Sequence, residues 1–174
     1  MLKKILLVIV VLIVAVLLYA TTKPDTFIVK RSVSIKASPE KIVALINDFN
    51  RWPSWSPWEK LDPTMKKTLS GPASGPGSIY EWEGNSKVGQ GRMEILESTP
   101  TQIKIKLDFI KPFEGHNITV FTLQPQGDVT NVTWDMSGPS NYMSKLMQVF
   151  MNMDTMIGND FEKGLAAMKA QAEG

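Results

Sequence analysis

The chain has 174 residues, 43% of them hydrophobic, and a formal net charge of +2. Domains usually contain about 100 to 150 residues, so this length predicts one folded unit. Apart from Lys3 and Lys4, which precede an apolar run, the chain has 17 basic and 17 acidic side chains. A neutral domain lacks the basic stripe that binds a phosphate backbone, so no nucleic-acid partner is expected. The absence of cysteine excludes a disulfide framework and a thiolate nucleophile.

The N-terminal segment predicts a membrane anchor over residues 1–22. Residues 5–22 carry no charge, and as a helix they would span ~27 Å of a bilayer core of ~30 Å. A cleaved signal peptide has a shorter apolar core, of about 7 to 15 residues, and an A-x-A-like site, which residues 19–22 match poorly. A cleaved signal peptide and a buried core helix are the alternatives. Lys3 and Lys4 favour a cytoplasmic N-terminus in an inner or plasma membrane, with the following domain periplasmic or extracellular.

A strand and a short helix are expected after a linker at residues 23–26. Residues 27–37 alternate apolar and polar side chains, which predicts a half-buried strand. Ser38 and Pro39 then supply the N-cap and the first turn of a helix that ends near Asp48. The apolar residues of this helix recur with helical spacing, so we expect one of its faces to pack on the domain.

The next segment, residues 50–61, is rich in tryptophan. Trp52, Trp55 and Trp58 recur at every third residue, and two prolines between them exclude a regular helix. Each indole would bury on the order of 200 Å². The segment is therefore interpreted as an aromatic plug at one end of the core or as the wall of a ligand cavity, and the two interpretations are compatible.

The remainder of the chain predicts six strands and one helix. Turn signals rich in glycine, proline and asparagine separate the strands and predict an antiparallel meander. These strands are expected at residues 65–70, 78–84, 88–98, 102–110, 116–124 and 129–137. Residues 142–171 carry an apolar stripe at steps of three and four, typical of one long amphipathic helix. The element order predicts an α+β fold in which a curved antiparallel sheet of about seven strands wraps around the C-terminal helix.

Four segments carry a resemblance to a known family. Residues 36–48 (KASPEKIVALIND), 50–58 (NRWPSWSPW), 80–85 (YEWEGN) and 88–93 (VGQGRM), with the closing helix, resemble the polyketide cyclase/dehydrase branch of the START and Bet v 1-like (SRPBCC) superfamily. The resemblance implies a helix-grip domain over residues 27–174. It also implies binding of lipids, steroids, polyketides or other apolar molecules. The branch takes its name from a few aromatase/cyclases, so membership alone does not imply an enzyme.

Few residues suggest catalysis. The single histidine, His116, has no second histidine with which to bind a metal, and a catalytic base needs an orienting partner, so a structural or exposed role is the leading interpretation. Glu81, Glu83 and Glu94 alternate with apolar neighbours, which assigns them to the solvent face. An inward carboxylate beside Arg92 would instead orient a polar head group or move a proton. Arg92, Glu81 and His116 are thus the catalytic candidates, and we expect no metal and no cofactor.

The predicted C-terminal helix carries six of the ten methionines. Flexible, polarizable methionines suit a cavity wall that adapts to its ligand, and ordinary core packing is the alternative. Gly158 and Gly164 each weaken a helix by about 1 kcal/mol relative to alanine. They are the positions at which we expect a kink that opens a portal.

The leading functional hypothesis is a non-catalytic carrier or sensor for a hydrophobic small molecule or lipid, held at the membrane by the anchor. The alternatives are a cyclase-like or hydrolase-like enzyme and a protein-interaction module of a membrane complex, which predicts an exposed apolar patch and a collapsed interior. The residues expected to line the cavity are Trp52, Trp55, Trp58, Tyr80, Trp82, Phe109, Phe121, Trp134, Met143, Met147, Phe150 and Met153.

Overall fold

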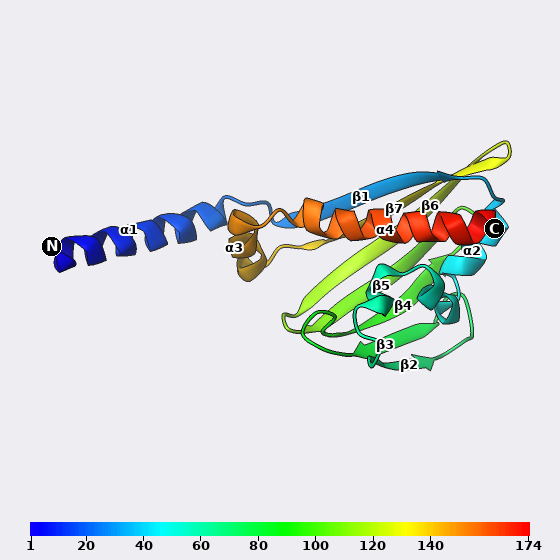
Figure 1. Ribbon diagram of the computed structural model, residues 1–174, viewed down its shortest axis with the longest axis horizontal. Coiled ribbons are helices and arrows are strands. Elements are labelled where there is room, and N and C mark those ends of the chain that lie inside the picture. Colours follow the sequence, from blue (N-terminus) through cyan, green and yellow to red (C-terminus); the bar gives the residue numbers. More distant parts are fainter.

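Seven strands form one antiparallel sheet with the order β1-β7-β6-β5-β4-β3-β2 in the computed structural model, which describes residues 1–174 (Figure 1). The strands are β1 (Thr26–Ile35), β2 (Lys66–Ser70), β3 (Ile79–Glu83), β4 (Gln90–Ser98), β5 (Gln102–Lys111), β6 (Gly115–Gln126) and β7 (Val129–Pro139). The helices are α1 (Leu2–Thr21), α2 (Pro39–Ile46), α3 (Tyr142–Phe150) and α4 (Met153–Glu173), with two 3-10 helices, η1 (Phe49–Ser54) and η2 (Pro57–Lys60).

The connectivity of the sheet is a meander from β2 to β7 that β1 completes at one edge. β1 pairs with β7 along its whole length, from Thr26 opposite Pro139 to Ile35 opposite Thr130. The chain then passes through α2, η1 and η2 to β2 at the opposite edge. This arrangement, with α4 lying along the sheet (Figure 1), confirms the predicted α+β helix-grip fold.

Helix α4 packs on the concave face, mainly along β1, through an apolar stripe. Phe161, Leu165 and Met168 are almost fully buried. Two glycines allow close approach: a Cβ at Gly164 would stand 2.9 Å from the Trp134 ring, and a Cβ at Gly158 would overlap the Arg31 guanidinium. Both glycines therefore serve helix packing, and α4 runs unbroken through them, so the predicted kink at these positions is wrong.

The chain turns instead at Met151 and Asn152, which separate α3 from α4. The Asn152 side chain accepts a hydrogen bond of 3.0 Å from the Thr155 amide and so caps the start of α4. The prediction of one helix over residues 142–171 is therefore wrong, because the methionine stripe continues across the break. Asn152 followed by an acidic residue in the first turn was the available signal for a new helix.

Helix α1 projects from one end of the domain, and α3 lies beside its C-terminal end (Figure 1). Helix α1 has 20 residues, and an 18-residue stretch of it has a mean hydropathy of 2.8, so α1 is long and apolar enough to span a membrane. Only 6% of this apolar stretch is buried, which excludes the alternative of a core helix. The C-terminal end of α1 packs on the domain. The Tyr142 hydroxyl donates a hydrogen bond to the Leu17 carbonyl at 3.2 Å, and Ala20 is fully buried.

Candidate ligand-binding cavity

A cavity of about 760 Å³ lies between the sheet, α3 and the first half of α4. It has 32 lining residues, of which 20 are hydrophobic. Cavities of about 300 to 1,000 Å³ with mainly apolar walls are the usual sites of small-molecule binding. The apolar walls include Phe27, Tyr80, Trp82, Met93, Leu107, Phe109, Trp134 and Met136 of the sheet and Met143, Met147, Met153, Met156, Ile157 and Phe161 of the helices.

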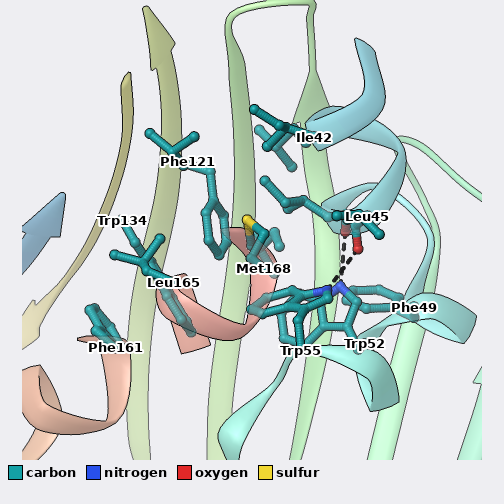
Figure 2. Close-up of a cluster of buried hydrophobic side chains, with 14 of the residues drawn as sticks. Ile42, Leu45, Phe49, Trp52, Trp55, Phe121, Trp134, Phe161, Leu165 and Met168 are labelled. Carbon is teal, nitrogen blue, oxygen red and sulfur yellow. Dashed lines mark hydrogen bonds between the residues drawn. The ribbon is translucent and has the colours of Figure 1, made fainter. Parts of the chain in front are cut away.

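A packed, largely aromatic core adjoins the cavity, and it includes Trp52, Trp55, Phe121 and Trp134 (Figure 2). The indole N–H groups of Trp52 and Trp55 donate to the backbone carbonyls of Ile46 and Leu45, each at 2.9 Å. These bonds fix both rings against the end of α2 and satisfy their polar atoms without water. The tryptophan segment is thus an aromatic plug beside the cavity, and Trp52 also reaches the cavity wall.

Trp134 connects the plug to the cavity. Its ring stacks on Phe161 of α4 with centroids 4.0 Å apart and meets Trp58 edge to face at 5.7 Å. Its indole N–H donates to the Thr119 hydroxyl at 2.8 Å. The side chain is 2% exposed. Trp134 therefore contacts α4, the sheet and the tryptophan segment at one point beside the cavity.

The cavity opens at the end of the domain that carries α1. Phe113, Met143 and Met156 line it and are 55%, 47% and 42% exposed. Helix α3 contributes residues to this rim, and its first residue, Tyr142, contacts α1. Lys145 of α3 also pairs with Asp25, which directly precedes β1. The rim is therefore apolar and adjoins the C-terminal end of α1.

One carboxylate is buried in the cavity wall. Glu59, whose side chain is 5% exposed, accepts hydrogen bonds of 2.6 Å from the Tyr80 hydroxyl and from Lys67 Nζ. Burial, and then the hydrogen bond to Glu59, raise the pKa of the Tyr80 hydroxyl well above its ordinary value. Tyr80 therefore stays protonated, and the ammonium group of Lys67 neutralises the charge of the Glu59 carboxylate. The cavity wall thus contains an ion pair and no unpaired charge at this point.

The sequence of the domain matches one protein family. Residues 26–173 match the family described as polyketide cyclase / dehydrase and lipid transport. The chain belongs to this family. None of the curated proteins matches it.

Solved structures similar to this polyketide cyclase / dehydrase and lipid transport domain share its fold at low sequence identity. A protein of Chromobacterium violaceum has 16% identity and a TM-score of 0.59, with 87% of this chain and 99% of that chain covered. Major latex-like protein 151 of Panax ginseng has 14% identity and a TM-score of 0.63, with 86% and 99% covered. The di-domain ARO/CYC protein StfQ of the steffimycin biosynthetic pathway has 8% identity and a TM-score of 0.62, with 85% and 51% covered.

The structure brings most of the predicted cavity residues of this family member together. Nine of them line the cavity: Trp52, Trp58, Tyr80, Trp82, Phe109, Trp134, Met143, Met147 and Met153. Trp55 and Phe121 face the same side of the sheet but are buried in the aromatic core beyond the cavity, where their rings meet at 6.0 Å. Phe150 does not line the cavity either, because it ends α3 on the outer side and is 72% exposed.

The three catalytic candidates do not converge in the cavity. Glu81 and Arg92 are cross-strand partners outside the concave face, and Arg92 pairs with Glu94 at 2.8 Å. His116 lines the cavity at its exposed rim, where its Nδ1 lies 2.8 Å from Asp108 Oδ1. Although burial opposes it, hydrogen bonds from Lys106 and His116 lower the pKa of Asp108. The structure thus gives His116 the orienting carboxylate that a base needs, but outside the apolar interior.

Sequence reasoning missed three polar residues of this site. Glu59 and Asn117 line the cavity, and Arg31 on the inner face of β1 fixes the α4 wall through Asp154 and Glu162. Polar residues are assigned to solvent by default, so the sequence pattern did not predict that these side chains belong to the site. The sequence gives one indication of this site: Arg31 stands at a position of the first strand where the alternation predicts an apolar, inward-facing residue.

Proposed function

We propose that this protein is a membrane-anchored carrier or sensor that binds a hydrophobic small molecule or lipid in the cavity, without catalysing a reaction. The observation that supports the proposal best is the position of the cavity mouth. The apolar rim lies beside α1, the one helix long and apolar enough to span a membrane. A lipid-like molecule leaving the bilayer would meet apolar side chains from Phe113 to Met156 before it met water.

The interior also fits this proposal better than the two alternatives. A protein-interaction module would have a collapsed interior, whereas this one contains about 760 Å³ of mostly apolar space. A cyclase-like enzyme would need a polar pair aimed at its substrate. The carboxylate inside the cavity, Glu59, is held by Lys67 and Tyr80, and the His116–Asp108 pair lies at the exposed rim.

Two methionines of the α3 region provide a matched test. Met147 lines the cavity, whereas Met151, four residues later and 44% exposed, does not. A lysine at either position can extend its ammonium group to water, so both variants should fold. Only the Met147→Lys ammonium would have to be displaced or desolvated when an acyl chain occupies the cavity.

The full chain, reconstituted in phosphatidylcholine vesicles, is titrated with methyl 9,10-dibromostearate, an uncharged acyl ester. All five tryptophans lie in the domain and none in α1, so bromine quenching reports entry of the acyl chain. We expect strong quenching in the wild type, at least roughly tenfold weaker binding for Met147→Lys, and no change for Met151→Lys. Equal quenching in all three proteins, or none in the wild type, would contradict the proposal.

A further inference from the structure

Asn117 and Ser56 are the two buried polar side chains of the cavity that have no hydrogen-bond partner in the protein, and Asn117 is the larger. Asn117 lies on the inner face of β6, lines the cavity and is 7% exposed. Its carboxamide makes no hydrogen bond with the protein, although its atoms are not enclosed by protein in the way that Asn47 Oδ1 is. An amide that opens onto the cavity and has no partner in the protein is free to hydrogen-bond a polar group of a bound ligand.

The surrounding backbone is shaped to admit this carboxamide. A Cβ at Gly138 of β7 would overlap Asn117 Oδ1 and stand 2.9 Å from its Cγ. On the other side, a Cβ at Gly115 would stand 3.9 Å from Nδ2. The amide thus lies in a slot that exists because β7 carries glycine at this position, which fixes where the amide meets the cavity.

The charges around the cavity favour an uncharged ligand group. The buried carboxylate, Glu59, is already paired with Lys67 and Tyr80, and the Asp160 carboxylate is paired with Lys163. The other ionisable lining residues, Lys87, Glu114 and His116, lie at the exposed rim. No unpaired charge is therefore buried beside Asn117 to balance an ionised head group. A carboxamide offers both N–H donors and an acceptor oxygen, which suits a hydroxyl or a carbonyl.

We propose that Asn117 is the polar recognition point of the cavity, and that the ligand is an amphiphile with an uncharged hydroxyl or carbonyl group on an apolar body. This inference rests on the proposed function and narrows its ligand class. Met93, Leu107 and Trp134 provide the apolar surface for the body of the ligand. The hydrogen bond to Asn117 adds selectivity for an oxygenated lipid over a hydrocarbon.

The test compares two probes that differ in one polar group, 11-bromoundecan-1-ol and 1-bromoundecane. Each quenches the tryptophans of the full chain in phosphatidylcholine vesicles, and comparing proteins in the same vesicles cancels partitioning of the probe into the bilayer. Asn117→Leu keeps the branching of the side chain and removes its polar atoms. We expect it to weaken binding of the alcohol about tenfold, the equivalent of about 1.4 kcal/mol, and to leave binding of the alkyl bromide unchanged or tighter.

Two further variants control for folding. Gly138→Ala should reduce alcohol binding in the same way, because its methyl group displaces the carboxamide. Asn131→Leu makes the same exchange on the outer face of β7 and should change neither probe. Equal effects of Asn117→Leu on both probes, or on neither, would overturn the role of Asn117 while the cavity function stands. Absence of quenching by either probe in the wild type would overturn the cavity function as well.

Discussion

Gly158→Ala should fail to give the gain in stability that alanine ordinarily gives inside a helix. Replacing an interior helical glycine by alanine is worth about 1 kcal/mol. At Gly158, however, the new methyl group would overlap the Arg31 guanidinium and stand 2.8 Å from its Nε. That guanidinium donates to Glu162 Oε1 at 2.8 Å and to both Asp154 carboxylate oxygens at 3.0 Å. The methyl group must therefore displace a side chain that holds the start of α4 on β1.

The Arg31→Leu background isolates this effect. Leucine at position 31 has no guanidinium group above Gly158, so the methyl group of alanine meets no obstacle there. Gly158→Ala should then raise the free energy of unfolding by about 1 kcal/mol. The difference between the two backgrounds is the coupling energy of the pair. Ala166→Gly, at an exposed position of the same helix, should cost about 1 kcal/mol in both backgrounds and calibrates the propensity effect.

Urea unfolding of the full chain in vesicles, followed by tryptophan fluorescence, measures the free energy of unfolding. It is applied to the wild type, the two single variants, the double variant, and Ala166→Gly in both backgrounds. A gain of about 1 kcal/mol from Gly158→Ala in both backgrounds would refute the reasoning. It would mean that the Arg31 guanidinium does not occupy the space above Gly158. The result bears on function because this part of α4 carries Met153, Met156 and Ile157 of the cavity wall.

Two predictions concern topology and pH. The chain has no cysteine, so Gln126→Cys provides a single thiol at the end of β6. A membrane-impermeant maleimide should label this thiol from the side of the membrane opposite Lys3 and Lys4. Labelling that occurs only after the membrane is permeabilised would contradict the predicted orientation. The hydrogen bond from Arg31 lowers the pKa of Asp154 below its ordinary value of 3.8, so this carboxylate stabilises the fold above that pH and loses its effect as the pH falls through the lowered pKa. The melting temperature of the wild type should exceed that of Asp154→Asn at pH 7, and the two should converge in acid; an equal difference at both pH values would contradict the ion pair.

The elements of the fold could be predicted from local pattern. Alternation locates the strands because successive side chains on a strand face opposite sides of the sheet. Helix α2 begins at Pro39, as the local signal predicted, and Ser38 occupies the N-cap position without a side-chain capping bond. The break at Met151 and Asn152 was missed because the apolar stripe persists on both sides of it. Spacing of three and four residues shows which face is apolar, and does not show whether the axis is continuous.

The cavity could be predicted only in part, for a different reason. Alternation decides which face of the sheet a side chain occupies and is silent about how far along the strand the core is filled. Phe121 and Asn117 share the inner face of β6, yet one belongs to the aromatic plug and the other to the cavity. The slot for Asn117 depends on Gly138 of the neighbouring strand, and such a pairing is visible only when register is known.

The pairing of β1 with β7 also determines the order in which the domain can assemble. The strand that follows α1 is synthesised first, but Thr26 must wait for Pro139, 113 residues later, before it can pair. The hairpins from β2 to β7 are local and can form early, whereas closing this long loop is entropically costly and slow. The edge of β7 therefore stays open until β1 pairs with it, and any delay at that stage exposes an unpaired strand edge.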